Sequence, residues 1–223
     1  MNAVLRPDPT VRRLYRAAPR PVRLHLALRW ITCPFPTIAD VVPSAGSILD
    51  VGCGHGLFAT ALAVASPARR VRGVDIDERK IRHAEAAAEH ARRHGLDVAF
   101  TLASPGQVPP GPWDCIVVVD VLYLLEPHDQ EALLRVCAAE LGAGGLLLVK
   151  EMAHSPKWKL AWNTLQEAIS VHVLRITRGR RLIPLPPARY RQWLATAGLS
   201  VDEQPLHRGY PHPHHLLVGR RNE

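Results

Sequence analysis

From Ser47 onward, short apolar runs alternate with longer amphipathic runs, and this alternation constrains the fold more than any other feature of the chain. The predicted strands are residues 47–51, 71–76, 97–103, 114–122 and 144–151. The predicted helices between them are residues 57–66, 78–94 and 129–141, and Gly95 and Gly142 follow two of these helices as stop signals. Such a pattern predicts βαβ units and a parallel sheet.

The remainder of the chain predicts helices around this core. Residues 158–176 carry apolar side chains at steps of three and four, so we expect a long helix there, followed by a basic cluster at 178–181. Residues 188–197 read as another helix, and residues 199–206 and 214–221 as an antiparallel pair. We expect one main domain in 47–223, preceded by a basic helical segment in 1–46 that can act as a lid, and within the domain a helical insertion in 151–187 over the open end of the sheet.

A glycine-rich turn joins the first strand to the first helix. It reads Asp50, Val51, Gly52, Cys53, Gly54, His55, Gly56, which places glycines where the backbone must turn and where a ligand can approach it. The spacing is GxGxG, because a dinucleotide fingerprint would need glycine at Leu57. No Lys or Arg occurs between Asp50 and Phe58, which argues against a phosphate-rich ligand.

A second acidic anchor follows the next strand. Asp75 can accept hydrogen bonds from both ribose hydroxyls of an adenosine, and Ile76 can lie against the adenine. Residues 47–150 carry ten basic and thirteen acidic side chains, a net charge of −3. An acidic core suits a ligand that bears a sulfonium and an amino group.

These motifs resemble the class I S-adenosylmethionine-dependent methyltransferases. The resemblance runs through ILDVGCGHG, GVDIDERKI, WDCIVVVDVLYLL and LGAGGLLLVKE, with a weaker match in YRQWLATAGLSV. It implies a Rossmann-like seven-stranded, mostly parallel sheet with helices on both faces and one antiparallel strand near the edge. It also implies S-adenosylmethionine as cofactor and S-adenosylhomocysteine as product. The cofactor-binding residues that we expect are Asp50, Gly52, Cys53, Gly54, Gly56, Asp75, Ile76, Ser104 and Asp120.

Two of these assignments stay open. The family often has an acidic residue after the third strand that contacts the adenine amino group, but this chain reads TLASPGQVP, so Ser104 or Gln107 would have to replace it. Asp120 either holds the amino group of the cofactor or acts on the acceptor.

Candidates for a general base are Asp120, Tyr123 and His154, which lie at or just beyond the ends of the fourth and fifth strands. Tyr123 can instead pack, and His154 can instead lie in solvent. The chain lacks the [DNS]PP[YFW] segment of amino-directed nucleic-acid enzymes, the Pro-Cys nucleophile of pyrimidine enzymes and a metal triad. We therefore expect no metal and a small organic acceptor.

Charge is unevenly distributed. The net charge is +8, and residues 1–46 carry seven Arg and two Asp. The arginines from Arg12 to Arg29 alternate with apolar residues that include Leu24, Leu26, Leu28 and Trp30. Such a flank suits an anionic membrane surface, an acidic carrier protein, or a lipid-like, quinone-like or carrier-bound acceptor. An RNA methyltransferase, for which nucleic acid would be the partner, and a non-catalytic cofactor-binding regulator are the alternatives.

The start of the chain lacks the apolar stretch of a signal peptide, and the four cysteines show no metal-ligand spacing. We expect a cytoplasmic protein with reduced thiols that can associate peripherally with the inner membrane face.

Overall fold

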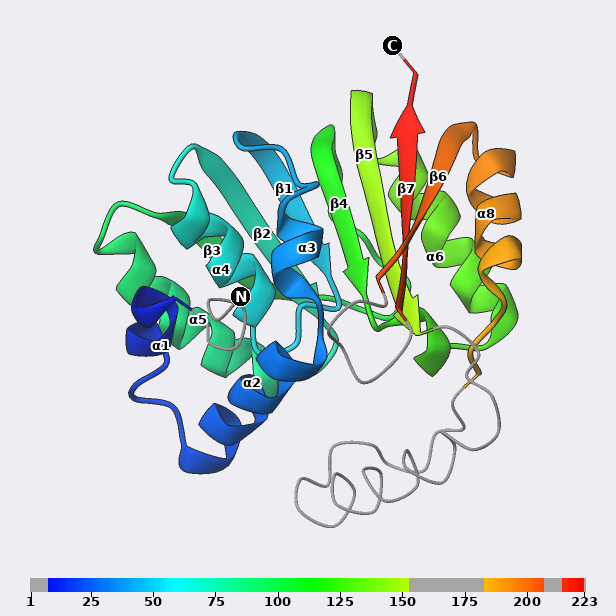
Figure 1. Cartoon of the computed structure of the whole chain (residues 1–223). Helices are drawn as coiled ribbons and strands as arrows, with labels where there is room; N and C mark the ends of the chain where they lie inside the picture. Colours follow the sequence, from blue (N-terminus) through cyan, green and yellow to red (C-terminus); the bar gives the residue numbers. More distant parts are fainter. Residues whose placement is uncertain (1–7, 153–182, 207–213, 223) are drawn as a thin grey trace.

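The central strand β1 (Gly46–Val51) lies between β2 (Arg69–Asp75) and β4 (Trp113–Val119), and both neighbours are parallel to it. The computed structural model describes residues 8–152, 183–206 and 214–222. Its other strands are β3 (Asp97–Leu102), β5 (Leu141–Met152), β6 (Leu199–Pro205) and β7 (His214–Arg221). They form one seven-stranded sheet in the order β3-β2-β1-β4-β5-β7-β6 (Figure 1).

Strand β7 is antiparallel to both β5 and β6, whereas the other described pairings are parallel. The expected fold, with one antiparallel strand near the edge, is confirmed. The antiparallel pair predicted for residues 199–206 and 214–221 is also present.

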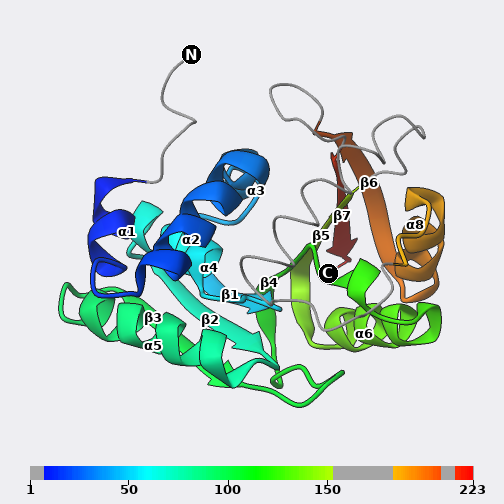
Figure 2. The same cartoon turned by 90° about the horizontal axis from the view of Figure 1, so that it is seen from below.

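Helices cover both faces of the sheet (Figure 2). One apolar core contains side chains from α1 (Pro9–Leu14), α2 (Arg20–Thr32), α3 (Phe35–Ala39), α4 (Leu57–Ala65) and α5 (Glu78–Arg92). The other contains side chains from α6 (Pro127–Ala139) and α8 (Pro187–Thr196). No helix lies between β3 and β4, and Ala103 and Val108 of that loop pack against the second core.

Local signals set the helix starts near the glycine loop. Helix α4 begins after Gly56, whose φ of 76° is left-handed. At the start of α5 the Asp77 carboxylate accepts hydrogen bonds from the amides of Arg79 and Lys80. Both helices therefore begin at the carboxyl edge of the sheet.

The predicted strand 114–122 is too long. Strand β4 ends at Val119, Asp120 has a φ of 57°, and a 3-10 helix η1 (Leu122–Leu124) follows. The Glu151 carboxylate accepts hydrogen bonds from the amides of Val121 and Leu122, so these amides are bound by a side chain rather than by a neighbouring strand. The chain turns at Asp120 for this reason.

The N-terminal segment 8–45 is part of the core on its inner side. On α2, Leu26 and Trp30 are buried, and Trp30 packs on Phe35, which stacks on Phe58 with 4.9 Å between ring centroids. The outer side of α2 exposes Leu24, Leu28 and Ile31, with 57%, 50% and 46% of their surface accessible. Helix α2 therefore carries apolar side chains on its buried side and also on its exposed side.

The predicted helix 158–176 and the basic cluster 178–181 lie outside the described residues, as does most of the predicted insertion 151–187. Among the helices that the structure describes, none has the length and apolarity needed to cross a bilayer.

Candidate functional site

The glycine loop forms the first wall of the candidate site. Gly52, Gly54 and Gly56 all have positive φ, which favours glycine over other residues. A Cβ on Gly52 would lie 2.3 Å from Val121, and one on Gly56 would lie 2.4 Å from Phe100, so these two glycines are also needed for packing. A Cβ on Gly54 would meet nothing within 4 Å. The loop therefore presents open space at Gly54.

Asp75 lies opposite this loop at the end of β2. Its Oδ2 accepts a hydrogen bond of 2.8 Å from the amide of Gly54, and its Oδ1 accepts one of 2.8 Å from the amide of Asp77. The two amides hold the carboxylate at the carboxyl edge of the sheet, beside the glycine loop. Sequence reasoning placed Asp75 and the glycines in one site, and the structure brings them together.

Two apolar side chains stand exposed next to Asp75. Ile76 follows it in the chain, Leu102 pairs with it in register from β3, and they expose 54% and 50% of their surface. An exposed apolar pair beside a fixed carboxylate suits a flat, apolar ring attached to a sugar. Ser104 and Gln107 form a turn beyond Leu102, in which the Ser104 carbonyl accepts from the Gln107 amide.

Asp50 and Cys53 lie behind the loop. Asp50 is buried, and burial together with the neighbouring Asp75 charge raises its pKa to about 7, although the Ala59 amide and the Arg29 charge act in the opposite direction. Burial raises the pKa of the Cys53 thiol well above its usual range. The Ala59 amide that contacts Asp50 belongs to the first turn of α4, so Asp50 lies close to the start of this helix. Cys53 is a neutral thiol.

Asp120 lies where β4 ends, between two cations. Its Oδ1 accepts from Lys150 Nζ at 2.5 Å, and its Oδ2 pairs with Arg29 Nη1 at 2.6 Å. Burial opposes ionisation of this carboxyl, but Lys150 and Arg29 outweigh it and hold the pKa of Asp120 below its usual range. Asp120 is therefore an ionised, doubly paired carboxylate.

The other two candidate bases are Tyr123 and His154. Burial and the Asp120 charge raise the pKa of Tyr123 above its usual range, so its hydroxyl is neutral. His154 lies outside the described residues. The structure brings Asp120 and Tyr123 to the same turn after β4, and their roles remain predictions.

The N-terminal helices contact the glycine loop directly. The Tyr15 hydroxyl donates a hydrogen bond of 2.8 Å to the His55 carbonyl and lies 3.1 Å from Thr60 Oγ1. The His25 ring of α2 lies 5.2 Å from the His55 ring, and burial is the main cause that lowers the pKa of His55 to about 4. The loop is thus fixed from the outside by α1 and α2.

Sequence reasoning missed four residues of this region as site residues. They are Arg29, Leu102, Lys150 and Glu151. Lys150 and Glu151 carried a usable signal, because two charges at the end of the apolar run LLLVKE must find partners when the strand is buried. Burial, together with the Asp120 charge, raises the pKa of Glu151 to about 8. Arg29 was noticed only as one of several basic residues.

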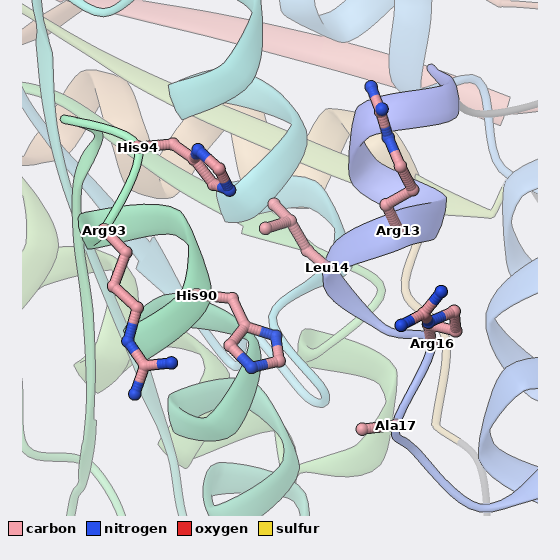
Figure 3. Close-up of a pocket in the computed structure, with 7 residues that line it drawn as sticks. All are labelled: Arg13, Leu14, Arg16, Ala17, His90, Arg93 and His94. Carbon is pink, nitrogen blue, oxygen red and sulfur yellow. The ribbon is translucent and has the colours of Figure 1, made fainter.

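A basic groove elsewhere does not belong to this site. It is lined by Arg13, Leu14, Arg16 and Ala17 on one side and by His90, Arg93 and His94 at the end of α5 on the other (Figure 3). Helix α5 has 15 residues, so its last turn lies about 20 Å from the end that touches Asp75. Basic side chains there complement the negative end of the helix dipole.

The strand order, the single antiparallel strand and the glycine loop facing Asp75 together define a Rossmann-like methyltransferase fold. A family model described as a methyltransferase domain matches residues 29–204, and the chain therefore belongs to this family. The match includes every described residue of the candidate site, from Arg29 to Glu151.

Curated relatives point in the same direction. A ubiquinone biosynthesis O-methyltransferase from Caulobacter vibrioides is 31% identical over 115 residues, which are 50% of this chain and 42% of that protein. The enzyme of the same name from Xanthomonas axonopodis is 24% identical over 177 residues, 74% of this chain and 67% of its own length. The first match spans less than half of the relative.

Solved structures share the fold. Magnesium protoporphyrin IX methyltransferase from Synechocystis, solved with bound S-adenosylhomocysteine, has a TM-score of 0.66 at 20% identity, with 96% of this chain and 93% of that chain covered. The pyocyanin biosynthetic protein PhzM has a TM-score of 0.69 at 18% identity, with 93% and 60% covered. The expected class I methyltransferase family is confirmed.

S-adenosylmethionine is the cofactor that this family indicates, and the residues present fit it. The open space at Gly54 leaves room for the methionine part of the cofactor beside the loop backbone. The fixed carboxylate of Asp75 can accept hydrogen bonds from the ribose hydroxyls, and the exposed side chains of Ile76 and Leu102 can pack against the adenine. Among the residues that the structure describes, no group of three or more His, Cys, Asp or Glu is placed to hold a metal ion.

Proposed function

We propose that the chain is an S-adenosylmethionine-dependent O-methyltransferase that acts on a small, hydrophobic, quinone-like acceptor bearing a hydroxyl group. The observation that carries the proposal is the Asp75 carboxylate, held by the Gly54 amide beside two exposed apolar side chains. The relatives named as ubiquinone biosynthesis O-methyltransferases support the acceptor class.

The residues of the chain divide the work between binding and alignment. S-adenosylmethionine supplies an electrophilic methyl group on a sulfonium when it is bound. Asp75 would accept hydrogen bonds from the ribose hydroxyls. The methionine part would lie against the backbone of the glycine loop at Gly52, Cys53, Gly54 and Gly56. The adenine would pack on Ile76, with Leu102 beside it. Ser104 contacts the adenine edge. Alignment of this kind can account for much of the acceleration of a displacement whose leaving group is neutral.

Asp120 holds the side chains of Arg29 and Lys150 in position and does not remove a proton from the acceptor. A carboxylate that two cations hold ionised has little affinity for a proton, so it is a weak base at neutral pH. Tyr123 lies close enough to Asp120 to feel its charge and stays a candidate for contact with the acceptor. His154, which lies outside the described residues, stays a candidate base from its position in the sequence.

We further propose that α2 brings the protein to an anionic membrane surface at the inner face of the membrane. The exposed residues Leu24, Leu28 and Ile31 lie on one side of the helix, and Arg20 and Arg23 are exposed beside them. Residues 9–39 contain six Arg and no Asp or Glu. Apolar side chains framed by arginines suit an anionic lipid surface, where a hydrophobic acceptor would be dissolved.

The test is methyl transfer from labelled S-adenosylmethionine to a panel of acceptors. The panel contains a catechol with a short prenyl chain, the same catechol without the chain, transfer RNA and a ribosomal protein mixture. We expect methylated catechol, with the prenyl form preferred, and much less with Asp75→Ala at limiting cofactor, whereas Asp97→Ala at an exposed ion pair should behave as wild type. Labelling of RNA alone would support the alternative of an RNA methyltransferase. Cofactor binding without transfer to any acceptor would support a regulator.

A further inference from the structure

Arg29 reaches from α2 to the turn after β4, where it meets Asp120. Its guanidinium Cζ lies 5.6 Å from the centroid of the Phe35 ring, and the same ring stacks on Phe58. Phe35 and Asp120 thus fix two sides of the guanidinium. The planar group has five donors, and only some of them are used by one carboxylate oxygen.

The two cations that bind Asp120 differ in their access to solvent. The side chains of Lys150 and Asp120 are 1% and 4% exposed, whereas that of Arg29 is 30% exposed. Lys150 therefore lies on the inner side of the carboxylate and Arg29 on the side that a ligand can reach. Both cations pair with Asp120, and together they exceed its single negative charge by one.

Arg29 is consequently a surplus cation at the rim of the site. Glu151, the next acidic group, uses its carboxylate to bind the amides of Val121 and Leu122 and makes no ion pair with Arg29 among the contacts described. A partly desolvated positive charge that exceeds the negative charge of its neighbours attracts an anion.

We propose that Arg29 binds the ionised oxygen of the methyl acceptor and so makes the N-terminal helix α2 part of the acceptor site. The inference rests on the proposed function in one respect, that the acceptor atom is a hydroxyl oxygen. The acceptor class is then narrowed to acidic hydroxyls, such as phenols and catechols, that bind as oxyanions.

Ionisation of the acceptor hydroxyl beside Arg29 also explains how the site can work without a strong base among its described residues. The hydroxyl proton is released to solvent when the acceptor binds, because the guanidinium stabilises the oxyanion. A lone pair of this oxygen forms the new C–O bond to the methyl carbon, and the electrons of the broken C–S bond remain on sulfur. The overall charge is balanced, since the sulfonium becomes a neutral thioether and the oxyanion a neutral ether.

The experiment uses the full chain saturated with S-adenosylhomocysteine and 4-nitrocatechol as the probe, because the absorbance of this phenol reports its ionisation. We expect the wild type to bind it as the anion at a pH where the free probe is mostly protonated. Arg29→Gln should bind it about tenfold to a hundredfold more weakly, as expected for a lost charge-assisted hydrogen bond, and without the shift in its ionisation. Arg12→Gln, an exposed arginine of α1, is the matched control and should behave as wild type.

Three results would overturn the proposal. One is equal affinity and an equal absorbance shift in Arg29→Gln. The second is that the wild type binds the neutral dimethyl ether of the probe as tightly as the probe itself. The third is that the wild type does not bind the probe at all.

Arg29→Lys decides the matter if Arg29→Gln does not fold, because lysine keeps the charge beside Asp120 but not the planar fork. We expect a weaker complex and a smaller shift, and wild-type behaviour would contradict the proposal. Cofactor affinity is measured in each variant and should change little. Arg29-dependent binding of the anion without methyl transfer to any phenol would contradict the proposed function alone.

Discussion

Arg29 Nη1 lies 2.6 Å from Asp120 Oδ2, and this ion pair joins the N-terminal helices to the turn after β4. Tyr15 forms a second link, to the glycine loop through the His55 carbonyl. The N-terminal segment therefore touches the cofactor side and the acceptor side of the site at once. These contacts favour a built-in wall of the site over a detachable lid.

Deletion of residues 1–30 should unfold the protein. It removes five buried side chains, Val11, Leu14, Tyr15, Leu26 and Trp30, from the first core. Each large apolar side chain contributes about 1.5–3 kcal/mol, so the sum is comparable to a typical net stability of about 5–15 kcal/mol. Circular dichroism during heating measures this loss. A truncated chain that keeps a cooperative transition and binds cofactor would restore the interpretation as a lid.

Asp75→Ala should weaken the binding of S-adenosylhomocysteine by about 1.5–3 kcal/mol, because the carboxylate would no longer accept charge-assisted hydrogen bonds. It also releases the amides of Gly54 and Asp77, so the loop loses its fixed position. Titration calorimetry gives the affinity, with Asp97→Ala as the control. An unchanged dissociation constant would remove Asp75 from the cofactor site.

Asp120→Asn should reduce the free energy of unfolding by about 3–5 kcal/mol, since it leaves Lys150 buried without its carboxylate. Asp97→Asn breaks an exposed ion pair with Arg72 and should cost no more than about 1 kcal/mol. Urea denaturation compares the two variants. Equal small losses would mean that the cations around Asp120 are better solvated than their burial indicates.

Asp50 should make the wild type less stable as the pH rises from about 4 to 7. Its pKa is raised to about 7 in the folded protein but is about 3.9 in an unfolded chain. The folded state then holds a proton that the unfolded state has lost, so stability falls across this window, by an amount on the order of 4 kcal/mol.

Asp50→Asn removes the titrating carboxyl group and should flatten the dependence of stability on pH. Denaturation at several pH values would measure this change. Other groups titrate in the same range, so the difference between the two proteins is the quantity to compare. Parallel curves for wild type and variant would mean that folding does not raise the pKa of Asp50.

Leu24→Ser combined with Leu28→Ser should release the protein from vesicles that contain anionic lipid. Leu24 and Leu28 expose 57% and 50% of their surface, so the change should not affect folding or cofactor affinity. Arginines near the surface contribute about 1 kcal/mol each, so binding should also weaken with salt. Vesicle sedimentation measures the fraction of protein bound, with neutral vesicles as control. Retention of the double variant at wild-type levels would exclude α2 as the membrane surface.

The succession of strands and helices along the chain, and most of the bounds of the helices between strands, could be predicted because periodicity and glycine positions report on local structure. Strand β7 was predicted at residues 214–221 and found there, and α4 starts at Leu57 as expected. The glycine loop and Asp75 could be paired because the carboxyl ends of adjacent parallel strands meet at one edge.

Contacts between distant segments left no such local signal. The alternation of Arg and Leu in α2 does not show which face packs inward, and Leu26 and Trp30 are buried only because Phe35 and its neighbours lie beneath them. The same holds for Arg29, which differs from its neighbours only in the carboxylate that it meets. The end of β4 at Val119 depended on Glu151, a residue of another strand.

The position of β7 has a consequence for assembly. This strand follows β6 in the chain, yet it lies between β5 and β6 in the sheet, so β6 is synthesised before the strand that it must pair with. The edge of β5 stays unpaired on that side until residues 214–221 have been made. Loss of these residues would therefore remove an interior strand and leave β6 without its partner in the sheet, and a newborn chain would expose the open edge of β5 to other chains until its synthesis reaches this point.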